Sequence, residues 1–324
     1  MEKWYSTVTA ATERFLTKRK IRREKKIAKQ KAKHPVVDWL EAFLWAAAVV
    51  LLINQYFFQA YQIPSGSMET TLLIKDRIFV NKMIYGPELI PGRIKIPGLT
   101  VPKRDQVVIF ESPTYLSKGP AFDVLQRVLY MVTLSIVDID RDEYGNPKAH
   151  FLIKRAIGVG RDRLRMVKGE LEYKPPGEGD WIPEADFIRY GSPEYKSRRL
   201  VAEDEYIGIR DSGFGDAFQD AKLPLSDEMQ TALNNNRNKY ADLYGWSGYR
   251  YESLYMIFPH NRKYGVEWRK TDMGWYIPEN WIFPMGDNRD NSRDARYFGP
   301  VQERDVLGKA MFKYWPLDRI GIIR

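Results

Sequence analysis

The sequence of 324 residues contains no cysteine. Without cysteine the chain has no disulfide framework, no thiolate metal site and no cysteine nucleophile. Histidine is also scarce, with three residues at positions 34, 150 and 260. They form no His-Glu-x-x-His motif, which excludes a zinc protease of that kind, and the chain lacks the Gly-x-Ser-x-Gly elbow of many serine–histidine enzymes. We therefore expect no metal and no cofactor.

Excess positive charge is missing from most of the chain. Residues 1–34 hold 12 Lys or Arg against three acidic residues, whereas the remainder holds 39 of each sign. A protein that binds nucleic acid through its folded body would present a basic face there. We therefore expect no nucleic-acid partner.

An uninterrupted apolar run long enough to cross a membrane is also missing. The longest one, Ala42–Ile53, has twelve residues, and a crossing helix needs about 20. Aromatic residues within 56–61 supply the remaining length and an interfacial belt, and the basic flank favours a cytoplasmic amino terminus. We predict a basic cytoplasmic tail at 1–36 and one transmembrane helix at 37–61. The alternative is a buried core helix; a cleaved signal peptide is disfavoured because no small-x-small site follows.

Beyond residue 61 the hydrophobic pattern predicts a mostly β fold. Strands are expected at 63–80, 106–110, 151–157, 310–315 and 319–323, with hairpins at 85–102 and 164–173. We group 62–174 and 279–324 into one β domain, which residues 111–150 interrupt as an insertion.

Two segments of the chain are predicted to be insertions. Within 111–150, the apolar part at 120–140 is interpreted as a core helix or strand, or alternatively as an interfacial segment that lies on a membrane. Residues 175–278 are polar and rich in Gly, Asn and Tyr. We predict that they form an inserted, β-rich second domain.

Three short motifs carry the chemistry of the chain: Ile63-Pro-Ser-Gly-Ser-Met68, Lys154-Arg-Ala-Ile-Gly158 and Gly286-Asp-Asn-Arg-Asp-Asn-Ser-Arg-Asp294. A serine hydroxyl needs a nearby base before it becomes a nucleophile. Lysine can be that base if it is neutral, but at its usual pKa of about 10.4 only about one in a thousand is uncharged near pH 7.5. The apolar neighbours of Lys154 favour burial, which lowers the pKa of a lysine. A solvated strand-edge lysine is the alternative that this residue alone leaves open.

Together the three motifs resemble the active-site boxes of the type I signal peptidase family. The resemblance implies that Ser67 is the nucleophile and that Lys154 is the general base. It also implies that Ser65 and the Ser67 amide form the oxyanion hole, and that Ser292 orients the lysine amine. The family's structural ion pairs are matched by five residues: Arg155, Asp287, Arg289, Asp294 and Arg296.

The resemblance also implies the substrate and its pockets. Ile63, Met68 and Ile153 would line pockets that select small residues at the −1 and −3 positions of a signal peptide. The expected protein is a membrane-bound serine endopeptidase that removes signal peptides from exported preproteins. Its β-sheet catalytic core would lie outside the bacterial cytoplasmic membrane, in contact with lipid and beside the secretion translocon, as a monomer.

The sequence departs from the family pattern at several places. Thr70 and Ala295 replace a usual proline and a usual serine, and Val159–Arg161 lacks the usual Pro-Gly before aspartate. The interval between Ser67 and Lys154 is also longer than expected. Two other functions stay open: a Ser/Lys self-cleaving repressor of the LexA type, which would need an N-terminal DNA-binding domain, and an inactive membrane-anchored binding or scaffold protein.

Overall fold

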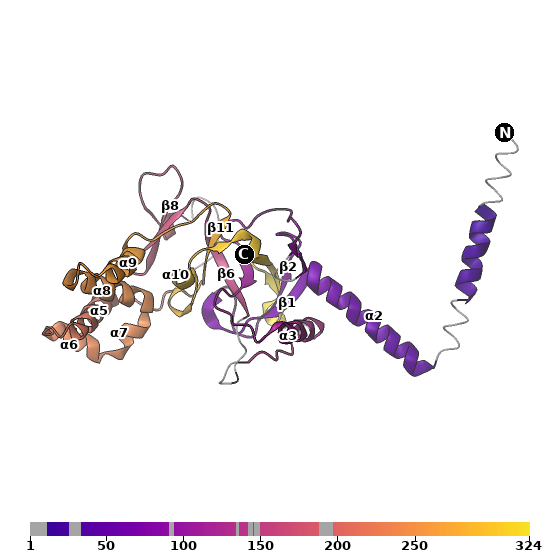
Figure 1. Ribbon diagram of the computed structural model, residues 1–324, viewed down its shortest axis with the longest axis horizontal. Helices are drawn as coiled ribbons and strands as arrows, with labels where there is room; N and C mark the ends of the chain where they lie inside the picture. Colours follow the sequence, from indigo (N-terminus) through magenta and orange to yellow (C-terminus); the bar gives the residue numbers. More distant parts are fainter. Residues whose placement is uncertain are drawn as a thin grey trace. The chain divides into compact units, whose positions relative to one another are not determined.

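The computed structural model describes residues 12–25, 34–90, 94–133, 136–141, 145, 150–187 and 197–324 (Figure 1). Much of the predicted basic tail, residues 1–11 and 26–33, lies outside this description, whereas 12–25 are helical. The chain divides into two compact units, Met1–Leu52 and Ile53–Arg324.

Helix α2, Pro35–Tyr56, contains most of the predicted transmembrane segment. It is long and apolar enough to cross a membrane, and large side chains such as Trp39 and Trp45 are exposed along it. A buried core helix would hide these side chains, so the exposure favours the transmembrane interpretation. The helix ends at Tyr56, earlier than predicted, because residues 58–62 pair with a neighbouring strand instead.

The larger sheet has eight strands in the order β1-β2-β13-β5-β6-β11-β12, with β14 paired to β13, and all its pairings are antiparallel. Their bounds are β1 Phe58–Gln62, β2 Arg77–Asn81, β5 Val107–Glu111, β6 Phe151–Val159, β11 Trp281–Met285, β12 Val301–Gln302, β13 Val306–Trp315 and β14 Gly321–Ile322. The strands predicted at 106–110, 151–157 and 310–315 are therefore confirmed, whereas the strand predicted at 319–323 is limited to Gly321–Ile322 because Arg319 still belongs to a 3-10 turn. The strand predicted from residue 63 is wrong up to residue 76, where the chain forms turns.

Two smaller sheets accompany this one. The order β10-β7-β8-β9 gives a four-stranded sheet, and β3 pairs with β4. Their bounds are β3 Glu88–Ile90, β4 Ile94–Lys95, β7 Arg163–Val167, β8 Glu170–Lys174, β9 Ile182–Pro183 and β10 Trp275–Tyr276. Both predicted hairpins are confirmed by these pairings.

The segment 175–278 is mainly helical, so its predicted β-rich character is wrong, and so is the description of the whole chain as mostly β. Its helices are α4 Glu184–Phe187, α5 Tyr206–Asp220, α6 Asp227–Asn234, α7 Asn236–Ala241, α8 Leu243–Ile257 and α9 Arg262–Asp272. Side-chain oxygens of Ser226, Asp242 and Asn261 accept hydrogen bonds from the first backbone N–H groups of α6, α8 and α9. Such caps stabilise the starts of these three helices.

Helix α3, Pro120–Val132, lies in the insertion at 111–150. Its inner side contributes Gln126, Tyr130 and Met131, which are buried. Tyr130 belongs to the hydrophobic cluster of β1, β2, β5 and β6, so the interpretation as a core element holds for this side alone. The outer side is exposed and apolar. The remaining helical elements are short: η1 Gly66–Met68, η3 Glu203–Glu205, η4 Arg289–Asn291, α10 Ala295–Phe298, η5 Glu303–Asp305 and η6 Leu317–Arg319.

Strand β6 lies inside the sheet, with β5 on one side and β11 on the other. Residues 153–158 of this strand are all buried. A polar side chain on this stretch therefore loses most of its contact with water. Lys154 is on it.

Candidate active site

Ser67 lies in the short turn η1, which follows β1 and the extended residue Ser65. The turn is held by Asn288, whose backbone N–H donates to the Ser67 carbonyl at 3.1 Å. The Asn288 side-chain amide donates to the Gly66 carbonyl at 3.0 Å. Ser67 is therefore fixed by a segment more than 200 positions later in the chain, and its side chain is buried.

Lys154 Nζ lies 2.6 Å from Ser67 Oγ, which is hydrogen-bonding distance. The lysine is 3% exposed, and burial lowers its pKa to about 8. Asp294 and Asp287 oppose this shift of the pKa, whereas Arg296 adds to it. At that pKa about a quarter of the molecules carry a neutral amine at pH 7.5. The predicted nucleophile and base are therefore adjacent, and burial acts on the base in the predicted direction.

Ser65 lies beside Ser67. Its hydroxyl is 3.5 Å from Ser67 Oγ, and the residue is exposed. A donor in this position is near the place where an attacked carbonyl would develop negative charge. Its assignment to an oxyanion hole remains a prediction.

Ser292 Oγ is buried and packs against Gly286. A Cβ atom added at Gly286 would lie 2.3 Å from Ser292 Oγ and 2.4 Å from the Ser67 carbonyl oxygen, so only glycine fits at that position. Ser292 Oγ has no well-formed hydrogen bond within the described part of the chain, although its hydroxyl helps to lower the pKa of Asp294. The predicted contact between Ser292 and the lysine amine stays a prediction.

Arg155, which follows Lys154 in β6, forms a buried ion pair with Asp287. Arg155 Nε and Nη2 donate to the two carboxylate oxygens of Asp287, each at 2.8 Å. Thr71 Oγ1 donates to the same carboxylate at 2.5 Å. Such a two-pronged arrangement fixes orientation as well as distance. It joins β6, the segment after Ser67 and the loop that begins at Gly286.

Asp294 and Arg296 form a second buried pair. Arg296 Nε donates to Asp294 at 2.9 Å, and the Gly286 N–H donates to the other carboxylate oxygen at 3.0 Å. Burial opposes the charge on Asp294, but the charge and hydrogen bonds of Arg296 hold its pKa below the usual value. Ala295 lies between them and packs in the hydrophobic core, so the absence of the usual serine leaves a buried methyl group there.

Glu184 completes the site in a way that sequence reasoning missed. Its two carboxylate oxygens accept from Arg289 Nη1 and Nη2, each at 2.5 Å, and both residues are buried. Arg289 was predicted to take part in an ion pair, but its partner lies 105 positions earlier, in the inserted segment. A Glu at the start of a short helix carries no local signal that identifies this partner.

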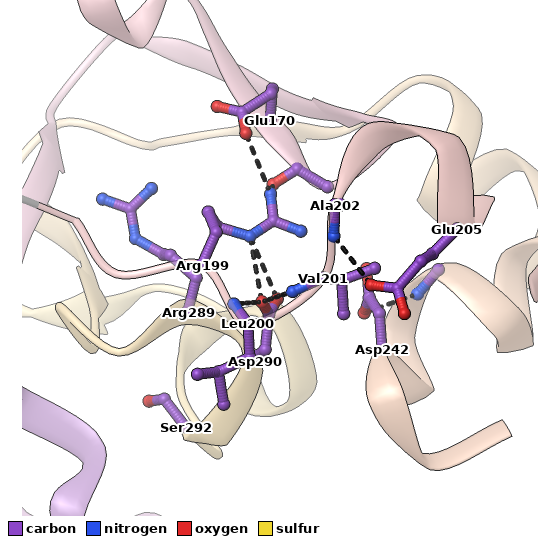
Figure 2. A network of polar contacts seen from close by, with 12 residues as sticks. Glu170, Arg199, Leu200, Val201, Ala202, Glu205, Asp242, Arg289, Asp290 and Ser292 are labelled. Atoms are coloured by element: carbon purple, nitrogen blue, oxygen red, sulfur yellow. Dashed lines mark hydrogen bonds and ion pairs between the residues drawn. The ribbon is translucent and has the colours of Figure 1, made fainter. Parts of the chain in front are cut away.

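The inserted segment is attached to the third motif at a second point. Asp290 accepts hydrogen bonds from the backbone N–H groups of Leu200 and Val201 and from Arg199 Nε (Figure 2). The backbones of Arg198 and residues 287–289 also pair, through two hydrogen bonds. The loop that holds Ser67 is thus supported on its other side by residues 198–201.

Ile63, Met68 and Ile153, the predicted pocket residues, are all buried in one hydrophobic cluster. Ile63 and Ile153 line a cavity of about 330 Å³. Their role toward a substrate stays a prediction. Within the described part of the chain, no three His, Asp or Glu side chains converge in a way that could hold a metal ion.

Known proteins resemble this chain over most of its length. The family described as signal peptidase, peptidase S26, matches residues 36–176 and 218–315. Signal peptidase I of Haemophilus influenzae is 27% identical over 282 residues, which are 87% of this chain and 70% of that protein. Signal peptidase I of Aquifex aeolicus is 27% identical over 276 residues, 85% of this chain and 82% of that protein. The Pseudomonas aeruginosa protein of the same name is 24% identical over 309 residues, covering 89% and 79%.

Proposed function

Because the chain belongs to the signal peptidase family, peptidase S26, and is a serine peptidase that cleaves signal peptides, we propose that Ser67 and Lys154 perform this cleavage as a catalytic dyad. The observation that carries the proposal is the 2.6 Å contact between Lys154 Nζ and Ser67 Oγ in a buried setting. Neither a self-cleaving repressor nor an inactive scaffold is needed to explain these residues.

The proposed reaction begins with proton transfer from Ser67 Oγ to the neutral amine of Lys154. Ser67 Oγ attacks the carbonyl carbon of the −1 residue, and the oxyanion is stabilised by the Ser65 hydroxyl and the Ser67 backbone N–H. The lysine ammonium then returns the proton to the leaving amine, which leaves an acyl-enzyme. Lys154, neutral again, takes a proton from water, whose oxygen attacks the ester. The lysine ammonium then returns this proton to Ser67 Oγ as the signal peptide leaves with a free carboxylate.

Residue positions around this dyad support the remaining roles. Asn288 and Asp287 fix the backbone of Ser67 and the strand of Lys154, respectively, so they act as positioning residues. The substrate pockets of Ile63, Met68 and Ile153 would accept small residues at −1 and −3. Ser292 would orient the Lys154 amine.

We infer that α2 crosses the bacterial cytoplasmic membrane once. Its 22 residues give a length of about 33 Å, and the hydrocarbon layer is about 30 Å thick. Basic residues precede the helix, which favours a cytoplasmic amino terminus. The unit from Ile53 onward would then act outside the membrane, beside the translocon, on exported preproteins.

The outer side of α3 supports a contact of this unit with lipid. Ala121, Val124, Leu125 and Val128 are exposed, and their spacing places them on one helical face. An exposed apolar face on a helix that is anchored by its other side suits an interface with a membrane. This favours the interfacial interpretation for the outer face of the segment.

The dyad is tested by replacing each member in the full-length protein in detergent. With a signal-peptide substrate carrying Ala at −1 and −3, Ser67→Ala and Lys154→Ala should each lower kcat/KM by about a thousandfold or more, because no other base or nucleophile replaces them. The matched controls are Ser253→Ala and Lys82→Met, which alter another buried serine and another buried lysine. Near-normal cleavage by either dyad variant would contradict the proposal.

A further inference from the structure

The Glu69 side chain lies against the turn that contains Ser67. A Cβ atom added at Gly66 would lie 2.6 Å from Glu69 Oε1, so this oxygen is directly beside the residue that precedes Ser67. The side chain is 23% exposed, and its other oxygen, Oε2, accepts from the Asn288 side-chain amide at 3.4 Å. The carboxylate is therefore held at the turn, partly removed from water.

A negative charge at this position opposes the proposed reaction. In that reaction the oxyanion is held between the Ser65 hydroxyl and the Ser67 N–H, which flank Gly66. Since Glu69 Oε1 lies against the same glycine, an unpaired carboxylate there would repel the charge that develops on the substrate. Such repulsion raises the energy of the transition state more than that of the bound substrate, whose carbonyl is uncharged.

Arg198 supplies the opposite charge. Its Nη1 donates to Glu69 Oε2 in an ion pair, although the arginine lies 129 positions later, in the inserted segment. The backbone of Arg198 is held independently of this pair. Its N–H donates to the Asp287 carbonyl at 2.7 Å, and its carbonyl accepts from the Arg289 N–H at 3.0 Å. A change of the side chain alone therefore removes the charge and leaves the segment attached.

Two other carboxylates in this region are also paired with arginines. Asp287 pairs with Arg155, and Asp294 pairs with Arg296. Both of these pairs lie among the residues that the family resemblance identifies, whereas Arg198 belongs to the inserted segment 175–278. The inserted segment thus brings a positive charge to the turn of Ser67, in addition to the backbone hydrogen bonds that support the loop.

We propose that Arg198 neutralises Glu69 and thereby keeps an unpaired negative charge away from the developing oxyanion, so that a residue of the inserted segment affects the rate of the chemical step. Arg198 acts through Glu69 and needs no contact with the substrate. The inference rests on the proposed function and adds to it a residue outside the three sequence motifs.

The test compares charge variants of the full-length protein in detergent, on a signal-peptide substrate with Ala at −1 and −3. Arg198→Gln leaves Glu69 unpaired and should lower kcat by about fivefold with little change in KM, a modest effect because water partly screens the charge. Arg198→Lys keeps the charge and should keep most of the activity. Adding Glu69→Gln to Arg198→Gln should recover most of the loss, and Glu69→Gln alone should not lower kcat.

The matched control is Arg165→Gln. Arg165 forms an ion pair with Glu172 across the β7–β8 hairpin, and both side chains are half-buried, as those of Arg198 and Glu69 are. This variant also leaves a glutamate without its arginine, but the glutamate does not lie on the turn of Ser67. It should cleave the peptide at the normal rate.

The outcomes separate the inference from the function on which it rests. A normal kcat in Arg198→Gln overturns the inference, and so does a double variant as slow as Arg198→Gln, because the ion pair would then serve only to hold the turn. If the wild-type protein does not cleave the peptide, the proposed dyad reaction itself fails. If Arg198→Gln does not fold, Glu69→Gln still decides the question, since a lower kcat in that variant contradicts a repulsive carboxylate.

Discussion

Lys154 is the residue whose surroundings decide whether the chemistry is possible. Strands β5 and β11 flank β6 and remove the amine from water. Asp287 and Asp294 would restore its charge, but each is already paired with an arginine, Arg155 and Arg296. The paired arginines therefore allow two carboxylates to be near the lysine without reversing the effect of burial on its pKa.

This environment predicts the pH dependence of the enzyme. Since Lys154 must be neutral to accept the proton, kcat/KM should rise about tenfold per pH unit below pH 7 and level off above a midpoint near 8, the pKa that burial gives this lysine. The measurement is kcat/KM for one peptide between pH 6 and 10. Burial also lowers the pKa of Lys82 to about 8. The variant Lys82→Met is the control for this second lysine. Because Lys82 takes no part in the proposed reaction, the variant should keep the same midpoint. A profile with a midpoint near 10 would contradict the buried base.

The sequence allowed these residue roles to be predicted unevenly. The burial of Lys154 could be predicted because most residues of its own strand are apolar, and this pattern is visible in the local sequence. The contact between Asn288 and the Ser67 carbonyl could not, since a side chain that stabilises a backbone turn 200 positions away leaves no local pattern. Gly286 belongs to the third sequence motif, but its close approach to Ser67 and Ser292 follows from the coordinates alone.

At the scale of elements, the Glu184–Arg289 pair joins the inserted segment 175–278 to the loop that begins at Gly286. Removing one partner of a buried ion pair leaves a charge unpaired, which costs about 3–5 kcal/mol. Glu184→Gln should therefore lower the unfolding free energy by about 3 kcal/mol, measured by denaturant unfolding of the full-length protein in detergent. Replacing both residues by Met should recover part of this loss.

The control for this prediction is an exposed pair of the same kind. Arg161 and Glu279 are 63% and 59% exposed, and exposed pairs contribute at most about 1 kcal/mol. Glu279→Gln should therefore change the unfolding free energy only slightly. Equal losses from Glu184→Gln and Glu279→Gln would show that the buried pair does not connect the two regions as described.

The strands and helices differed in how well the sequence predicted them. Strands β5 and β6 contain apolar, buried runs inside a sheet, and such runs can be recognised without knowledge of their partners. The helices α5 to α9 have polar, Gly- and Asn-containing sequences that are typical of loops. The available signals were the caps at Ser226, Asp242 and Asn261, each placed before a helix. The prediction gave weight to composition and overlooked them.

At the scale of the whole molecule, the proposed contact of α3 with lipid should speed cleavage of substrates that are inserted in a bilayer. Val124 and Leu125 are 62% and 53% exposed. In vesicles that contain the full-length protein and an inserted preprotein, Val124→Asp with Leu125→Asp should lower the cleavage rate by about fivefold, because charge opposes insertion of the helix into the interface. Cleavage of a short soluble peptide should be unchanged.

The matched control is Ile207→Asp, which places an acidic residue on α5, where the isoleucine is 62% exposed. This variant should cleave both substrates at the normal rate. A loss that is the same for the inserted preprotein and the soluble peptide would mean that α3 supports the fold, and that its outer face makes no contact with lipid.

The hydrogen bonds from Asn288 to the Ser67 turn determine how early in biosynthesis the site can form. A ribosome releases the amino end first, so the serine and the lysine emerge well before the loop that fixes them. During that interval the nascent protein carries the proposed nucleophile and base without the hydrogen bonds that hold the Ser67 turn. We therefore expect the proposed dyad to be assembled late in biosynthesis, after the second half of the chain has been made.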